Sequence, residues 1–354
     1  MNKVLISLII SIFLSLPLYL IHFGIDNKLI NSFLFLIGII LFYKNDIKSY
    51  PWIGFFTSIL WLWWIGLSFR YYDLSFLIPF VILGIGVFYW IIFYLLTFLK
   101  SKIIIILFFI FGLSFIKPFG FDWFRYDIIL AHTYFYISNP TIPPANLKIK
   151  TINTKIAQDK KWDKTFIPKE IDNNLKYITQ AINKNYQIVV LPETAFALAL
   201  NQYPNLINTL KNLSQKITII TGSLYYKNNH YYNSTYLFKN GEFQVFNKHI
   251  LVPFGEYIPF PCCKKFFNNL FFNGAQDFQK AKNFSSYKIE NTTFLNAICY
   301  EVTNEKLYKE NPKYIIAISN NAWFYPSIEN TLQKLLIEFY SKKYQKFVYH
   351  SINY

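Results

Sequence analysis

The chain contains little arginine, and this shortage argues against a nucleic-acid partner. Only Arg70 and Arg125 are arginines among 35 basic residues, although the net charge is +16. The lysines are scattered among asparagine and aromatic residues and form no basic stripe on a nucleic-acid-binding motif. We therefore expect no nucleic-acid partner, and we assign the positive charge to attraction of anionic membrane lipids.

The chain also contains few histidines and lacks a glycine-rich loop of the kind that binds phosphate. The chain has five histidines, none at a spacing typical of metal ligands: His22, His132, His230, His249 and His350. No glycine-rich phosphate loop follows an expected strand. The sequence therefore predicts neither a metal site nor a cofactor.

Cysteine is limited to the adjacent pair Cys262 and Cys263 and a single Cys299. Cys299 follows an apolar run typical of a strand, where a nucleophilic thiolate can be held by a rigid element. A buried structural cysteine would fit the same pattern. If Cys299 is a nucleophile it must stay reduced, which leaves the state of the other two open.

Apolar residues, which make up 53% of the chain, are concentrated in its first third. Five apolar segments are long and poor enough in charge to suggest membrane spans: 4–22, 29–43, 52–69, 74–98 and 103–119. The first could instead be a signal peptide because Lys3 precedes it, but no small-residue cleavage site follows. Residues 1–120 are therefore predicted to form a helical membrane domain of about five spans.

The basic residues around these segments predict their orientation. One side of the arrangement carries Lys3, Lys44, Lys48, Lys100 and Lys102, and the other carries Lys28, Arg70 and Lys117. The side richer in lysine should be cytoplasmic. We expect a multi-pass protein of the bacterial inner membrane whose remaining residues face the periplasm.

The pattern changes after a connecting segment at 121–146, which is rich in aromatic residues and proline. Residues 147–354 alternate short apolar runs with helical stretches, as in an α/β domain. Strands are expected at 147–153, 186–191, 217–223, 232–238, 293–299 and 314–319, and helices at 168–185 and 329–343.

Three polar residues lie beside apolar runs in this part of the chain. Glu193 comes just after an expected strand, where burial would raise the pKa of a carboxyl toward that of a general base. A glutamate at a helix N-terminus after Pro192 explains it equally well. Lys248 and Glu256 bracket a loop containing proline and glycine, and the lysine could stabilise an oxyanion or could be an ordinary surface lysine.

The order Glu193, Lys248, Cys299 resembles the carbon–nitrogen hydrolase (nitrilase) superfamily. The contexts are Leu-Pro-Glu-Thr, Lys-x-x-Leu-Val-Pro-Phe-Gly-Glu-Tyr and Cys-Tyr-Glu. The apolar segments, the Phe-Gly-Glu-Tyr-Ile-Pro stretch and Ser319-Asn-Asn-Ala-Trp-Phe324 are similar to the apolipoprotein N-acyltransferases within it. This resemblance implies a nitrilase-like αββα sandwich after the membrane domain.

The resemblance also implies roles for individual residues. Cys299 would be the nucleophile, Glu193 the general base, and Lys248 the oxyanion-stabilising group, helped by the backbone N–H of Tyr300. Glu256, Tyr300 and Glu301 would support them. Trp162 would lie near the lipid entrance, and Trp323 would contribute to substrate binding.

The implied reaction moves an acyl chain from a phospholipid to the amine of the N-terminal cysteine of a diacylglyceryl apolipoprotein, the last step of lipoprotein maturation. A membrane-tethered amidase and an inactive, truncated remnant are the alternatives. Asn321 and Tyr325 depart from the family, which often has Asp and Gly there. Residues 347–353 resemble the start of a strand that the family continues into further strands and a last span, so the domain is expected to be incomplete at its C-terminus.

The predicted orientation can be tested with a reporter fused after Lys117. Five spans that start in the cytoplasm end outside, so alkaline phosphatase at this point should be active and a cytoplasmic fluorescent reporter should be dark. The reverse pattern would show that one span has been gained or lost, and would place the α/β domain in the cytoplasm.

Overall fold

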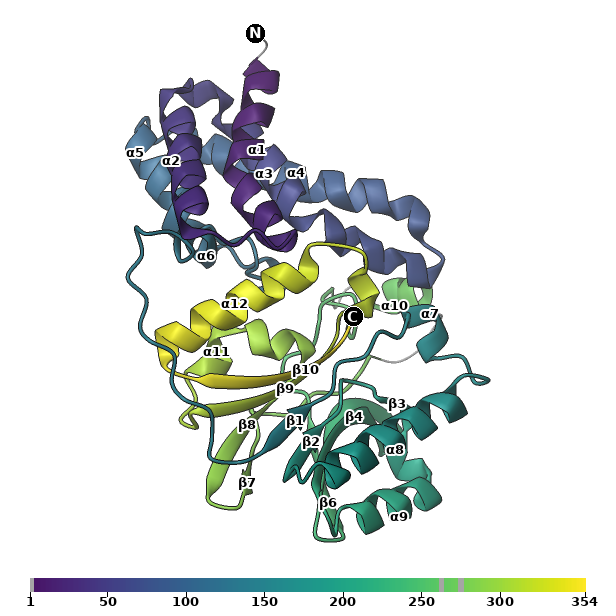
Figure 1. The fold of residues 1–354 in the computed structure, drawn as a ribbon. Coiled ribbons are helices and arrows are strands. Elements are labelled where there is room, and N and C mark those ends of the chain that lie inside the picture. The colour runs from purple at the N-terminus through teal and green to yellow at the C-terminus, as the bar shows by residue number, and fades with distance from the viewer. Residues whose placement is uncertain (1–2, 261–263, 273–276) are drawn as a thin grey trace. The chain divides into compact units, whose positions relative to one another are not determined.

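A computed structural model describes residues 3–260, 264–272 and 277–354 (Figure 1). Cys262 and Cys263 lie outside these residues, so their pairing stays open. The chain divides into two units. One contains Met1–Asn139 and Pro326–Phe339, and the other contains Pro140–Tyr325 and Tyr340–Tyr354.

The first unit is helical wherever a membrane span is expected. Its helices and helical turns are α1 (Lys3–His22), α2 (Lys28–Lys44), η1 (Ile47–Ser49), α3 (Tyr50–Leu62), η2 (Trp63–Tyr72), η3 (Ser75–Leu77), α4 (Ile78–Thr97), α5 (Lys102–Leu107), η4 (Phe108–Gly112), η5 (Leu113–Phe115), η6 (Pro118–Gly120) and α6 (Asp127–Leu130).

Three helices in the described part of the chain are long and apolar enough to cross a membrane: Lys3–His22, Ile47–Tyr72 and Ser75–Thr97. The second expected span forms α2, a helix of 17 residues, and the fifth falls in the shorter apolar helix Lys102–Phe115. A total of five spans therefore remains a prediction.

Small residues allow these helices to pack closely. Ser7 and Ser11 of α1 donate hydrogen bonds to the backbone oxygens of Ser49 and Ile53, each at 3.2 Å. A Cβ added to Gly54 of α3 would come within 2.4 Å of the Phe93 ring. Such contacts are typical of helix pairs in membranes. Lipid tails are as apolar as the helices, so the helices associate through close packing and hydrogen bonds rather than through the hydrophobic effect.

The second unit contains two β-sheets. The first has the order β1-β2-β4-β5-β6, with β3 also paired to β4, and the second has the order β10-β9-β8-β7. The strands of the first are β1 (Ile149–Thr151), β2 (Ile188–Val190), β3 (Phe196–Ala199), β4 (Thr218–Lys227), β5 (His230–Lys239) and β6 (Glu242–Asn247). Those of the second are β7 (Ser286–Ile289), β8 (Thr292–Ile298), β9 (Tyr314–Asn320) and β10 (Phe347–Asn353).

The two sheets pack face to face. Ile188 and Val190 of β2 share one core with Ile316 and Ile318 of β9, whereas Val189 points to the opposite side of its sheet. Side chains alternate between the faces of a strand, so burial of both faces explains why β2 is apolar throughout.

Helices cover the outer faces. Figure 1 shows α8 (Ile167–Asn183) and α9 (Pro204–Leu213) beside the first sheet, where Ile178 and Leu210 join Val189 in a second core. Beside the second sheet, on the side away from the first, lie α11 (Glu305–Tyr308) and the end of α12 (Glu329–Tyr344), joined by contact of the Tyr308 and Tyr340 rings. The predicted αββα sandwich is confirmed.

Strands are present at all six expected places, but three others were not predicted from the sequence. They are β3, β6 and β7, which are short or alternate between apolar and polar residues. The C-terminal run Phe347–Asn353 forms β10, parallel to β9.

One glycine of β4 allows a close approach to the turn after β2. A Cβ at Gly222 would lie 2.6 Å from both the Glu193 Cα and the Thr194 N, which are backbone atoms. We expect Gly222→Ala to lower the free energy of unfolding by about 1–3 kcal/mol, because neither atom can move aside without displacing the turn.

Gly255→Ala is the matched control, because its Cβ would make only ordinary van der Waals contacts with Val252, none shorter than 3.4 Å. Both variants can be compared by thermal unfolding in detergent. Equal stability of the two would show that the turn after β2 adapts freely.

Candidate active site

The three residues expected to react lie at strand ends of the second unit. Glu193 is in the turn between β2 and β3, Lys248 follows β6, and Cys299 directly follows β8 at the start of η9 (Cys299–Thr303). Lys248 interacts electrostatically with both Glu193 and Cys299. The structure therefore brings all three together.

The Glu193 carboxylate is buried, with the residue 6% exposed, and each of its oxygens accepts a hydrogen bond. Asn233 Nδ2 in β5 donates to Oε1 at 2.7 Å, and the backbone N–H of Asn320 at the end of β9 donates to Oε2 at 2.8 Å. One donor comes from each sheet, so the packing of the sandwich fixes the orientation of this carboxylate.

Lys248 is 1% exposed and forms an ion pair with Glu256, at 2.8 Å from Nζ to Oε2. The same oxygen accepts the backbone N–H of Val252 at 2.8 Å. Burial alone would lower the pKa of Lys248, but Glu256, Cys299 and Glu193 raise it above its ordinary value. The ammonium is therefore charged at neutral pH.

A single side-chain amide connects the two carboxylates. Asn233 Nδ2 donates to Glu193 Oε1 at 2.7 Å and to Glu256 Oε1 at 2.8 Å. The backbone oxygen of Asn233 also accepts a hydrogen bond from the backbone N–H of Lys248, at 2.9 Å. The amide thus separates two negative charges while fixing the start of the Lys248 loop.

The turn that carries Cys299 is held by Glu301. Glu301 Oε2 accepts the N–H of Ile298 at 2.8 Å, and Oε1 accepts those of His249 at 2.7 Å and Ile250 at 3.0 Å. Burial raises the pKa of Glu301 to about 7, although Lys248 and the three N–H groups favour its ionised form. One carboxylate therefore ties the cysteine turn to the lysine loop.

Backbone strain is present in all three segments. Thr194, Phe254 and Cys299 have φ values of 47°, 60° and 54°, in the left-handed region that residues with a Cβ rarely adopt. Each such residue costs on the order of 1–3 kcal/mol and persists only where its surroundings enforce it. This conformation at Cys299 turns the chain sharply out of β8.

The other expected residues are Tyr300, Trp162 and Trp323. Tyr300 is a buried residue of η9, and its backbone oxygen accepts a hydrogen bond from Thr303 Oγ1 at 2.8 Å. Trp162 is 41% exposed and follows Lys161, whose Nζ donates to the Glu193 backbone oxygen at 3.0 Å. Trp323 is half-buried in η10 (Asn321–Phe324), just after Asn320.

A chain of amides connects the site to β10. Asn353 Nδ2 donates to Asn320 Oδ1, and Asn320 Nδ2 donates to Gln158 Oε1, both at 2.8 Å. Thr154 Oγ1 donates to Asn353 Oδ1, also at 2.8 Å. The backbone N–H of Asn320 donates to the Glu193 carboxylate. The hydrogen bonds of the Asn320 side chain therefore help to fix the backbone at this donor.

Sequence reasoning assigned no role to Asn233, Asn320 or Lys161, although Asn320 lies in the stretch Ser319–Phe324 that resembles the family. The chain is rich in asparagine and lysine, so nothing in its composition distinguishes these three residues. Asn233 reaches the carboxylates of Glu193 and Glu256 because β5 pairs between β4 and β6. This strand order cannot be read from the sequence around Asn233.

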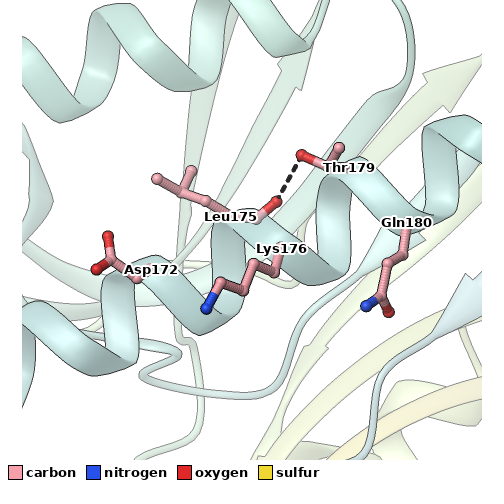
Figure 2. A pocket seen from close by; sticks show the side chains of 5 residues that line it. All are labelled: Asp172, Leu175, Lys176, Thr179 and Gln180. Carbon is pink, nitrogen blue, oxygen red and sulfur yellow. Dashed lines mark hydrogen bonds between the residues drawn. The ribbon is translucent and has the colours of Figure 1, made fainter.

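A surface pocket on α8 lies apart from these residues. It is lined by one face of the helix, where Thr179 Oγ1 donates to the Leu175 backbone oxygen at 2.9 Å (Figure 2). None of the candidate residues lines it, and it has no part in the chemistry discussed below.

Comparison with known proteins identifies the family. Residues 1–161 match the model of the apolipoprotein N-acyltransferase integral membrane domain. The apolipoprotein N-acyltransferase of Campylobacter jejuni is 40% identical, over 99% of this chain and 88% of the relative. The chain belongs to the apolipoprotein N-acyltransferase family.

A second relative is similar over nearly its whole length. The apolipoprotein N-acyltransferase of Wolinella succinogenes is 36% identical, over 98% of this chain and 93% of the relative. Among solved structures, a carbon–nitrogen hydrolase superfamily protein from Xanthomonas campestris has a TM-score of 0.45 and 14% identity, over 58% of this chain and 76% of that one. Membership in this family makes the chain a membrane acyltransferase.

The bridging amide can be tested by Asn233→Asp, which puts a third carboxylate between Glu193 and Glu256. We expect the free energy of unfolding at pH 7 to fall by about 3–5 kcal/mol, because the new charge is buried without compensation. The new carboxyl would have a raised pKa, so the loss should shrink as the pH falls and the group takes up a proton.

Asn212→Asp makes the same chemical change on the exposed face of α9 and should alter stability by no more than about 0.5 kcal/mol. Denaturant unfolding at pH 7 and pH 5 compares the two. A deficit for Asn233→Asp that is independent of pH would rule out charge repulsion as its cause.

Proposed function

We propose that the protein transfers an acyl chain from a phospholipid to the α-amine of the N-terminal cysteine of a diacylglyceryl apolipoprotein, through a thioester on Cys299. The observation that carries this proposal is the group formed by two buried residues, Glu193 and Lys248, and the half-buried Cys299. It combines a thiol, an oriented carboxylate and a fixed cation within a membrane acyltransferase.

In the first half-reaction Glu193 takes the proton of the Cys299 thiol. The thiolate attacks the carbonyl carbon of the acyl ester, and the carbonyl oxygen becomes an oxyanion. The Lys248 ammonium and the backbone N–H of Tyr300 stabilise this oxyanion. The C–O bond then breaks, the departing lysophospholipid oxygen takes the proton from Glu193, and a thioester remains on Cys299.

In the second half-reaction the acceptor amine attacks the thioester carbonyl and passes a proton to Glu193. The C–S bond breaks as the amide forms, and the cysteine sulfur recovers its proton from Glu193. A thioester keeps much of the transfer potential of an ester and reacts readily with an amine, so the exchange needs no cofactor.

The neighbouring residues support these steps. Glu256 holds Lys248 in place and keeps it charged, and Glu301 holds the backbone on both sides of the reaction centre. Trp162 and Trp323 contact the lipid substrates. Residues 1–120 anchor the catalytic domain of residues 147–354 in the inner membrane, on its periplasmic side, where both lipid substrates arrive laterally.

The decisive experiment incubates purified full-length protein in detergent with labelled phospholipid and analyses its peptides by mass spectrometry. We expect an acyl adduct on Cys299 that disappears when a diacylglyceryl peptide with a free N-terminal amine is added. Cys299→Ala should form no adduct. A well-folded wild-type protein without an adduct would overturn the proposal.

Lys248→Met should slow adduct formation by about 10²–10³-fold, the usual effect of losing an oxyanion-stabilising group. Lys176→Met on the exposed face of α8 is the control and should match the wild type. Hydrolysis of small amides without any need for phospholipid would instead support an amidase.

A further inference from the structure

A second lysine is buried behind Glu193. Lys161 ends α7 (Gln158–Lys161) and is 1% exposed, and its Nζ donates to the backbone oxygen of Glu193 at 3.0 Å. The next residue, Trp162, is 41% exposed. The chain therefore directs a cation inward and an aromatic ring outward at consecutive positions.

This cation is buried without a direct ion pair. Among the described residues, Lys161 has no carboxylate oxygen within 4.0 Å of its Nζ. Burying an ammonium in this way costs several kcal/mol after relaxation. An uncharged donor could serve the Glu193 carbonyl at much lower cost, so the hydrogen bond alone does not explain the charge.

Three acidic groups surround the ammonium at longer range. They are Glu193 in the turn after β2, Glu170 in α8 and Cys299 in η9, and each favours the charged form of Lys161. Glu170 is itself buried, and its Oε2 accepts no hydrogen bond among the described residues. Burial raises the pKa of Glu170, and both Lys161 and the side chain of Asn174 favour its ionised form.

The two buried lysines differ in what holds their charge. Burial lowers the pKa of Lys161 to about 8, whereas the close pairing with Glu256 raises the pKa of Lys248. Lys248 has one carboxylate of its own. In the described part of the chain Lys161 has no such partner, and the groups that favour its charge are Glu193, Glu170 and Cys299, the first and last of which also interact with Lys248.

We propose that Lys161 is a positioning residue that holds the Glu193 turn and supplies the positive field in which Glu193 and Cys299 together carry one negative charge. This inference rests on the proposed function. Proton transfer moves the charge from the carboxylate to the sulfur without changing the total. A cation near both groups therefore favours the singly ionised pair over the fully protonated one.

The test measures alkylation of Cys299 by iodoacetamide as a function of pH, using full-length protein in detergent. Peptide mass spectrometry separates Cys299 from Cys262 and Cys263. The alkylation rate measures how much of Cys299 is in the thiolate form and does not require acyl transfer. The inference can therefore be tested independently of the proposed function.

Lys161→Gln keeps an N–H donor for the Glu193 carbonyl but removes the charge. We expect its alkylation at pH 7 to be about tenfold slower, with the ascending limb of the pH profile moved up by about one unit. Lys161→Arg keeps the charge and should restore most of the wild-type rate. A wild-type rate and profile for Lys161→Gln would overturn the inference.

Glu170→Gln provides a second test that leaves the lysine in place. Because Glu170 favours the charged form of Lys161, its removal should leave less positive charge on the lysine and move the ascending limb to higher pH, in the same direction as Lys161→Gln but by less. If the lysine variants fail to fold, an unchanged or downward-shifted profile for Glu170→Gln overturns the inference by itself. Wild-type protein that shows the expected profiles but no acyl adduct would contradict only the proposed function.

Discussion

The buried ion pair between Lys248 and Glu256 is the interaction on which the rest of the site depends. A charge removed from water is tolerated only when its remaining hydrogen-bonding positions are filled. Glu256 meets this requirement with Val252 and Asn233, and the second hydrogen bond of Asn233 reaches Glu193. The position of one cation thus determines the geometry of two carboxylates.

The sandwich makes this network possible because donors from both sheets converge at strand ends. Asn233 belongs to the first sheet and Asn320 to the second, and Glu193 receives a hydrogen bond from each. Close packing between the sheets also enforces the left-handed conformations of Thr194 and Cys299, which an isolated loop would relax. Stability of the core and alignment of the site are therefore linked.

Much of this architecture could be predicted from the sequence. Continuous apolar runs indicated the buried strands β2 and β9, and short residue contexts marked Glu193, Lys248 and Cys299. The strands β3, β6 and β7 escaped because half-exposed or very short strands lack a clear apolar run. Asn233 and Lys161 escaped for a different reason, since their importance arises from strand order and burial rather than from any local pattern.

The amide chain from Asn353 through Asn320 to Gln158 gives the site an order of assembly. During synthesis, Glu193, Lys248 and Cys299 leave the ribosome well before β10 does. Until β10 pairs with β9, Asn320 lacks its partner Asn353, and the backbone that orients the carboxylate is not fixed. The growing chain therefore carries the three candidate residues for some time before β10 can complete the hydrogen bonds behind the Glu193 carboxylate.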